Sequence, residues 1–296
     1  MINQIRYDDL LSMTEELDGM LVNHVEWLTL LHKTIVCNLP FSNSLLRDLK
    51  TCEFGKWYYS VTHPAVTESP EFIHLGRIHN NLHTIANRIL EQYKNNVITQ
   101  ESEYDSFVDV EKEFFDTFNN FIENVLSTKS QFDHMTNLPN RNLITLILEK
   151  EYSRVKRNNG DCCIAFADID HFKHVNDTYG HASGDRVLTE LSGYFSSSIR
   201  PYDSVGRYGG EEFMFCFPQT ELSNASEFLE RIRSGIEGLS IRIDKSNTIK
   251  VTCSFGLTRM RGNKSLTEII KQADNAMYAA KDNGRNRLKV WSDGEA

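Results

Sequence analysis

Four acidic residues fall at two places where an apolar run meets a turn. Asp168 and Asp170 follow the apolar run 162–167, and Glu211 and Glu212 follow a Gly-Gly pair at 209–210. If the two runs are neighbouring strands, three or four carboxylates converge in a cleft, and such hard oxygen ligands suit Mg²⁺ that bridges substrate phosphates. A solvated acidic hairpin with a lone strand-end aspartate would have the same spacing. These residues alone leave both interpretations open.

A second group with metal-ligand chemistry is a pair of histidines four residues apart. His79 and His83 lie on a predicted helix, where this spacing places both on one face and lets both reach one metal ion. Such a pair is weak evidence by itself, because the same spacing occurs by coincidence on partly exposed faces. Cys52 and His24 are further residues that could complete a site.

The elements that must position the acids alternate between strand and helix. Continuous apolar runs at 162–169, 213–217 and 250–257 predict buried strands. Helical periodicity occurs at 143–158, 182–199, 223–237 and 265–282. We therefore expect an α/β domain with a sheet covered by helices. The Gly-Gly pair predicts a tight β-hairpin in which glycine supplies positive φ angles.

The histidines and Cys52 lie in a half whose periodicity is helical throughout. Apolar residues recur at helical spacing from 7 to about 127, with breaks at Pro40, around 52–70 and near 95–99. About four helices result, and a four-helix bundle is their simplest packing. Turn-forming residues at 133–140 then indicate a boundary, which gives a helical domain at 1–127 and an α/β domain at 128–296.

Composition limits the classes of partner. The chain has 296 residues, 40% hydrophobic and 25% charged, which is typical of globular domains. Its net charge of −9 argues against general nucleic-acid binding, which needs a basic surface. There is no apolar run long enough to cross a bilayer, so we expect a cytoplasmic chain with no membrane partner. In that compartment the six cysteines are expected to be reduced, as core residues or metal ligands.

The second half resembles the GGDEF domain of diguanylate cyclases from about 133 to 287. The resemblance implies a palm-like βαββαβ core that condenses two GTP molecules into cyclic di-GMP. Met135 stands where that family commonly has leucine and Asn137 where it has glycine, which puts the geometry of the first turn in question. The matching segments are 133–141 (DHMTNLPNR), 168–173 (DIDHFK), 176–181 (NDTYGH), 184–185 (GD), 207–213 (RYGGEEF) and 273–281 (ADNAMYAAK).

The same resemblance implies the roles of individual residues. Asp168, the Ile169 carbonyl and Glu211 would bind Mg²⁺ or Mn²⁺, with Glu212 beside them as a further metal ligand or proton-handling group. The implied GTP site consists of the guanine-binding pair Asn176 and Asp185, the triphosphate contacts Lys173, Lys281 and Arg285, and Phe172.

Two further expectations concern assembly and feedback. Each such domain holds one GTP, so joining two GTP molecules requires two facing sites and therefore at least a homodimer. Arg200 and Asp203 stand at the offset of the family's product-binding inhibitory motif, and Arg231 matches a secondary arginine. An Arg-x-x-Asp tetrad is a very weak signal alone, because an exposed Arg and Asp at a helix end have the same pattern.

The first half resembles the chemoreceptor zinc-binding domain from about 10 to 127. His24 followed by Trp27, Cys52 followed by Phe-Gly-x-Trp, and the His79–His83 pair match that family in type and order. The resemblance implies that His24, Cys52, His79 and His83 bind Zn²⁺, and a His₃Cys set suits tetrahedral zinc.

Together the two resemblances imply a cyclase that zinc inhibits through the packing of the helical domain. Oxidation of the Cys52 thiolate that releases zinc is a rival signal. Three other functions stay open: a non-catalytic cyclic di-GMP receptor that uses Arg200 and Asp203, a zinc buffer whose second half only dimerises, and an enzyme of adenine nucleotides. Intact 209–213 argues against the first, and Asn176 with Asp185 argues against the last.

Overall fold

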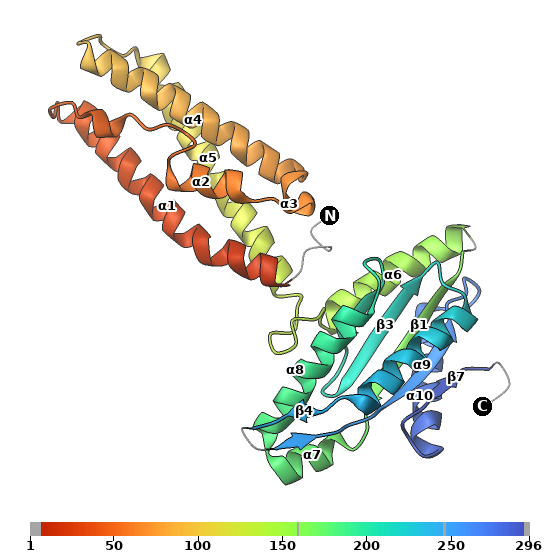
Figure 1. Cartoon of the computed structure of the whole chain (residues 1–296). Coiled ribbons are helices and arrows are strands. Elements are labelled where there is room, and N and C mark those ends of the chain that lie inside the picture. Colours follow the sequence, from red (N-terminus) through yellow and green to blue (C-terminus); the bar gives the residue numbers. More distant parts are fainter. Residues whose placement is uncertain (1–6, 159, 245–246, 293–296) are drawn as a thin grey trace. The chain divides into compact units, whose positions relative to one another are not determined.

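The computed structural model describes residues 7–158, 160–244 and 247–292. The chain divides into two compact units, 1–130 and 131–296 (Figure 1). The predicted order of a helical region followed by a sheet covered by helices is confirmed.

Three long helices make up most of the first unit: α1 (Tyr7–Val36), α4 (Pro70–Lys94) and α5 (Glu101–Lys129). The chain between α1 and α4 contains the short elements η2 (Asn43–Leu45), α2 (Glu53–Ser60) and α3 (Pro64–Thr67). The fourth helix expected from the periodicity is therefore the eight-residue α2, which packs beside α1 (Figure 1). Much of the segment that carries α2 is irregular, and this segment supplies one of the candidate metal ligands.

The long helices bury one face each. The hydroxyl of Ser69 caps α4 by accepting a hydrogen bond from the Phe72 amide at 3.2 Å, and Pro70 follows at the position where a missing amide costs nothing. Along α5, Phe107, Phe114 and Phe118 are buried on a single face. Each such side chain contributes roughly 1.5–3 kcal/mol on burial. In the described ranges, no helix combines the length and the apolar character that crossing a bilayer requires.

The second unit is built on a five-stranded sheet in the order β2-β3-β1-β6-β7. The strand β1 is antiparallel to both β3 and β6, whereas β6 and β7 are parallel. The elements are α6 (Arg141–Asn158), β1 (Cys162–Ile169), α7 (Phe172–Tyr179), α8 (His181–Ser198), β2 (Ser204–Arg207), β3 (Glu212–Pro218), α9 (Leu222–Gly238), β4 (Ile241–Arg242), β5 (Thr248–Ile249), β6 (Cys253–Arg259), α10 (Leu266–Asp282) and β7 (Leu288–Val290).

Helices cover both faces of this sheet. Cys163 and Ala165 of β1 belong to a core shared with α8 and α9, while Ile164 and Phe166 belong to one shared with α6 and α10 (Figure 1). Burial on both faces explains why β1 is a continuous apolar run rather than an alternating one. The strand predicted at 250–257 is β6, displaced to 253–259, and the short strands β4 and β5 form a separate ribbon before it.

The second unit begins with a turn at 133–140 that carries both departures from the family pattern. The Asp133 carboxylate accepts hydrogen bonds from the amide and hydroxyl of Thr136 at 2.9 and 2.6 Å. Asn137 has a φ of 56°, in the left-handed region that glycine favours and that asparagine tolerates. Asparagine in place of glycine is therefore compatible with this turn.

Candidate functional site

The ends of β1 and β3 bring three predicted carboxylates together. Asp168 is the register partner of Glu212 across the β1–β3 pair, and the Ile169 amide donates to the Glu211 carbonyl at 3.3 Å. Asp168 is buried, whereas Glu211 and Glu212 are partly exposed. The acidic pair after the Gly-Gly turn thus lies beside the end of β1.

We call the group formed by Asp168, Glu211 and Glu212 the acidic edge. Cations from the end of α10 and from the chain that follows it act on this edge. The Lys281 ammonium lies 2.8 Å from Asp168 Oδ2. Arg285, three residues beyond α10, is exposed and its charge also favours the ionised form of Asp168. Two of the three predicted triphosphate contacts therefore act on one predicted metal ligand.

Burial is the main cause that raises the pKa of Asp168, Glu211 and Glu212 above their ordinary values. For both glutamates the next cause is the charge of Asp168. Carboxylates that disfavour one another's ionisation are stabilised by a cation placed among them, so this donor set fits a divalent metal ion.

Two further aspartates near the end of β1 have roles that the sequence did not indicate. Asp170 is buried and accepts hydrogen bonds from the Ser254 and Thr252 hydroxyls at 2.6 and 2.7 Å and from the Asn286 amide at 2.9 Å. It therefore holds the end of β1 to the chain around β6 and β7. Asp274 of α10, which the sequence reasoning missed, is near enough that its charge raises the pKa of Glu212, after burial and Asp168.

The turn between β2 and β3 corrects one expectation. Neither Gly209 nor Gly210 has a φ in the left-handed region, so the glycines do not supply the positive φ angles predicted for the hairpin. A Cβ on Gly209 would lie 2.2 Å from Glu212 Oε2, so a larger residue there would require the end of the Glu212 side chain to move. Arg207 supports the turn by donating to the Gly210 carbonyl at 2.7 Å and to Asp133 at 3.0 Å.

The predicted guanine-binding residues lie at the corner between α7 and α8. Gly180, with a φ of 81°, separates the two helices. A Cβ on Gly184 would lie 2.0 Å from Asn176 Oδ1 and 3.1 Å from the Phe172 ring, so glycine lets α8 pass close to α7. Phe172 is buried and Asn176 is half-buried, while Lys173 and Asp185 are exposed.

The predicted inhibitory motif forms a turn before β2. The Asp203 amide donates to the Arg200 carbonyl at 3.0 Å, and Asp203 Oδ2 accepts from the Arg200 amide at 3.2 Å. Asp203 is buried, which raises its pKa, whereas Arg200 is exposed. Arg231 is also exposed and lies over the Phe228 ring at 4.9 Å. This motif therefore presents guanidinium groups outward and keeps its carboxylate inside.

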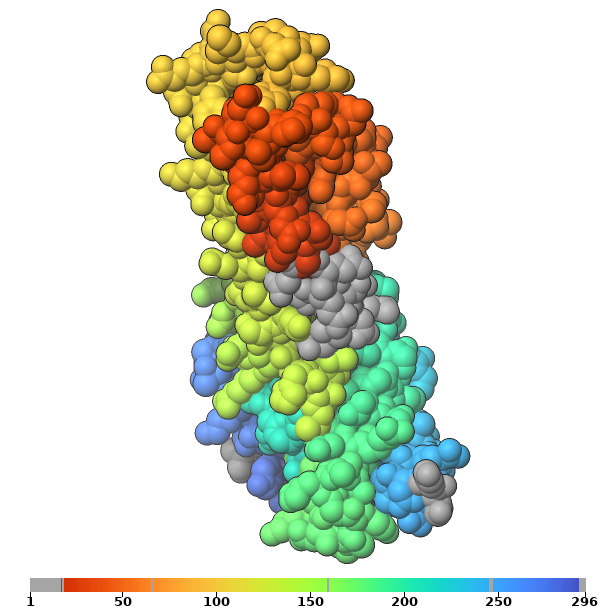
Figure 2. Space-filling model, turned by 90° about the vertical axis from the view of Figure 1, so that its left-hand side faces the viewer, coloured from red at the N-terminus to blue at the C-terminus, as the bar shows by residue number. Residues whose placement is uncertain are grey.

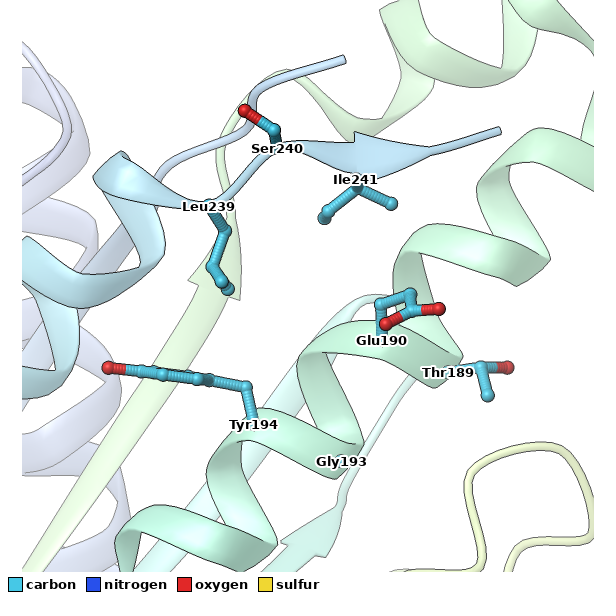
Figure 3. Close-up of a pocket in the computed structure, with 7 residues that line it drawn as sticks. All are labelled: Thr189, Glu190, Gly193, Tyr194, Leu239, Ser240 and Ile241. Carbon is cyan, nitrogen blue, oxygen red and sulfur yellow. The ribbon is translucent and has the colours of Figure 1, made fainter. Parts of the chain in front are cut away.

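A surface hollow of about 360 Å³ lies elsewhere on this unit, between α8 and the chain that leads into β4. Figure 2 shows the blue β4–β5 segment beside the green surface of α8. Tyr194 and Glu190 line the hollow opposite Leu239 and Ile241 (Figure 3). None of the predicted site residues lines it.

In the first unit, the structure brings the four predicted zinc ligands into one buried cluster. One donor atom from each of His24, Cys52, His79 and His83 lies within 4.8 Å of the others. Cys52 Sγ is 3.3 Å from His79 Nε2, and His83 Nε2 is 3.4 Å from His24 Nε2. His24 comes from α1, Cys52 from the start of α2, and the other two from α4.

Local packing fixes where these donors point. Cys52 caps α2, and its sulfur accepts from the Gly55 amide at 3.1 Å. A Cβ on Gly55 would lie 1.7 Å from the Leu49 carbonyl oxygen, so this close turn requires glycine. The Trp27 ring stacks on the His83 ring with 4.6 Å between the ring centroids, and the centroids of the Phe54 and His79 rings are 4.3 Å apart. Trp27 is itself buried.

Burial is the largest influence on the protonation of all four donors. It lowers the pKa of His24 to about 4 and that of His79 to about 2, and it lowers the pKa of His83. It raises the pKa of the Cys52 thiol. Neutral imidazoles offer a nitrogen lone pair to a metal ion, and three of them with one cysteine sulfur make a four-donor N₃S set that fits Zn²⁺.

Without zinc, acid is expected to destabilise the first unit. His24 has a pKa of about 4 when folded against about 6.5 when unfolded, so the unfolded state binds a proton more readily below pH 6.5. The free energy of unfolding should therefore fall as the pH drops from 6.5 toward 4, by up to about 3 kcal/mol for His24. Urea unfolding in chelator at several pH values measures this. His24→Leu should reduce the slope and His74→Ala should keep it, and a flat profile in the parent would contradict the argument.

Comparison with known protein families gives one match in each unit. The family model described as diguanylate cyclase, GGDEF domain, matches residues 130–287, and the chemoreceptor zinc-binding domain matches residues 24–90. The first match contains the acidic edge and the α7–α8 corner, and the second contains all four members of the buried cluster.

Individual relatives match one or both units. Diguanylate cyclase DgcP of Pseudomonas aeruginosa is 40% identical over 162 residues, 55% of this chain, but the match spans only 24% of DgcP. Diguanylate cyclase DgcZ of Escherichia coli is 29% identical over 290 residues, 94% of this chain and 96% of DgcZ.

A solved structure gives the same picture for the second unit. The GGDEF domain of DgcB from Caulobacter crescentus, in complex with c-di-GMP, is 33% identical and covers 54% of this chain and 95% of that one, with a TM-score of 0.53. The chain therefore belongs to the diguanylate cyclase family defined by the GGDEF domain, and it carries a chemoreceptor zinc-binding domain ahead of that domain.

Proposed function

We propose that this chain condenses two GTP molecules into one cyclic di-GMP and two pyrophosphates. The observation that supports this most directly is the convergence of Asp168, Glu211 and Glu212 beside Lys281, inside the segment that matches the cyclase family. In each half-reaction a ribose 3′-hydroxyl of one GTP attacks the α-phosphorus of the other. One P–O bond forms, the bond to pyrophosphate breaks, and the hydroxyl proton is released.

The residues around the acidic edge suit this substrate. Lys281 and Arg285 supply positive charge near Asp168 where a triphosphate would lie, and Lys173 is exposed on α7. Asn176 and Asp185 offer an amide and a carboxylate, which can pair with the donors and acceptor on the edge of guanine. Adenine presents a different pattern at that edge. Phe172 packs against Gly184 and fixes the corner that holds the pair.

Asp168, the Ile169 carbonyl and Glu211 would hold Mg²⁺ or Mn²⁺, with Glu212 as a further ligand or proton acceptor. When bound, the metal would lower the pKa of the attacking hydroxyl and neutralise charge on the departing pyrophosphate. The carboxylates would hold that ion, and the charge of Lys281 favours the ionised form of Asp168 against the effect of burial. Because each chain offers one such edge, the working form is a homodimer with two facing GTP sites.

Zinc would control the reaction through the helical module at 1–127, ahead of the catalytic module at 128–296. Ligands on separate helices fix one packing of that module when zinc binds, because all four donors must meet one ion. We propose that this packing keeps the two GTP sites from facing each other, so that zinc inhibits the cyclase.

The direct test is to incubate the purified chain with GTP and Mg²⁺ and to separate the products by chromatography. We expect cyclic di-GMP and pyrophosphate in a 1:2 ratio, and no cyclic product from ATP. A folded protein that binds GTP without turnover would instead favour the receptor function.

Product inhibition gives a separate prediction. Arg200 and Arg231 are exposed guanidinium groups that could bind the phosphates of cyclic di-GMP. Arg200→Ala should raise the product concentration needed for half-inhibition about 10- to 100-fold, the loss typical of one hydrogen bond to a charged group. Initial rates at increasing added product measure it, with Arg242→Ala as an exposed control on β4. Equal inhibition of the parent and the Arg200 variant would remove the motif from the proposal.

A further inference from the structure

The helix α4 carries another polar side chain one turn beyond the last candidate zinc ligand. Asn87 follows His83 by four residues, so the two lie on the same face. The Asn87 amide nitrogen donates to the Arg47 carbonyl at 2.9 Å, and its oxygen accepts from the Arg47 amide at 3.2 Å. One side chain thus binds both backbone groups of a residue 40 positions away.

The Arg47 carbonyl has a second partner, which is His83. The distance from His83 Nδ1 to this oxygen is 3.1 Å. A carbonyl oxygen can only accept, so the ring must carry its proton on Nδ1. In the neutral ring that proton leaves the lone pair on Nε2, the atom that lies 3.4 Å from His24 Nε2 within the cluster.

Arg47 lies in the irregular chain between η2 and α2, where no helix fixes its backbone. On the other side, Trp27 donates to the Leu45 carbonyl at 2.8 Å and lies under the Arg47 guanidinium at 5.8 Å. Within the part of the chain that the structure describes, the hydrogen bonds to the Arg47 backbone come from His83 and Asn87. The position of the carbonyl that orients His83 therefore depends on Asn87.

We propose that Asn87 is a positioning residue of the zinc site. It holds the Arg47 carbonyl in place, and that carbonyl selects the His83 tautomer whose Nε2 faces the other three donors. This inference rests on the proposed zinc binding and adds a residue that is not itself a ligand. Groups that orient a ligand in this way typically change metal affinity about 10- to 100-fold.

Two substitutions at Asn87 separate the effect of the hydrogen bond donated to the Arg47 carbonyl from the effects of side-chain shape and charge. Asn87→Leu has a similar volume and loses both hydrogen bonds. Asn87→Asp keeps the shape and the acceptor but cannot donate to the Arg47 carbonyl, and its negative charge would by itself attract a metal ion. Asn81→Leu on the exposed side of α4 is the matched control.

The experiment measures Zn²⁺ affinity of the full chain by competition with a chromophoric chelator, together with the absorption spectrum of the Co²⁺-substituted protein. We expect both Asn87 variants to bind zinc about 10- to 100-fold more weakly and to lose intensity in the tetrahedral Co²⁺ bands, while the Asn81 variant matches the parent. Unfolding in chelator checks that the metal-free variants are folded, and if Asn87→Leu is not, Asn87→Asp carries the test.

Parental affinity in either folded Asn87 variant would overturn the inference while leaving the zinc site intact. A parent that binds no zinc would remove the zinc site and the inference with it.

Discussion

Replacing Glu211 by glutamine is expected to reduce cyclic di-GMP synthesis by roughly 10³-fold, equivalent to about 4 kcal/mol of transition-state stabilisation. The neutral amide keeps the shape of the side chain but cannot balance a divalent cation. Loss of the Glu211 charge leaves Asp168 and Glu212 to balance the metal ion, and Asp168 is already paired with Lys281 at 2.8 Å. Steady-state synthesis at saturating GTP and Mg²⁺ measures the effect.

Glu227→Gln is the matched control, because Glu227 is exposed on α9. It should leave the rate unchanged. Binding of a fluorescent GTP analogue to the Glu211 variant distinguishes lost chemistry from lost folding, since the cations and the α7–α8 corner are intact. Should the Glu211 variant turn over GTP at a rate near the parent's, the acidic edge would not be the catalytic centre.

The acidic edge could be predicted to a large extent because its residues lie where apolar strands begin or end. The continuous apolar run before Asp168 predicted a strand buried on both faces, and the Asp168–Glu212 register pair bears out the predicted neighbouring strands. The sequence could not separate Asp168 from Asp170, which stand two positions apart. What separates them is the set of donors from Thr252, Ser254 and Asn286, far along the chain, which occupies Asp170.

The Gly-Gly turn shows a different limit. Glycine pairs between strands commonly supply positive φ angles, and that prior gave the wrong reason here. A Cβ on Gly209 would instead meet the end of the Glu212 side chain, a contact that the turn propensity of glycine does not contain. Asp274 was missed for a similar reason, because only the packing of α10 beside the sheet makes its charge felt at Glu212.

The candidate zinc ligands were predictable by type and order, but the residues that orient them were not. His79 and His83 have helical spacing, whereas the segment that holds Arg47 has no periodicity from which its position could be deduced. Asn87 resembles any polar residue on a helix until its partner across the unit is known.

Removing zinc from the parent protein is expected to raise cyclic di-GMP synthesis on the order of tenfold, a coupling of about 1.4 kcal/mol between the metal site and the cyclase. His79→Ala removes a proposed ligand whose Nε2 lies 3.3 Å from Cys52 Sγ, so this variant should be active without a chelator. Initial rates with and without a strong zinc chelator, with bound zinc measured in parallel, test both statements.

His74→Ala controls for loss of a histidine from α4, because His74 is outside the cluster and partly exposed. It should keep the parent's zinc content and its response to chelator. Loss of zinc from the parent with no change in rate would separate the metal site from the cyclase, and a His79 variant that stays inhibited and chelator-sensitive would exclude His79 as a ligand. Equal activation of the parent by chelator and by oxidation of Cys52, with zinc released in both cases, would instead make the thiolate part of the signal, because losing any one donor opens the same buried cluster.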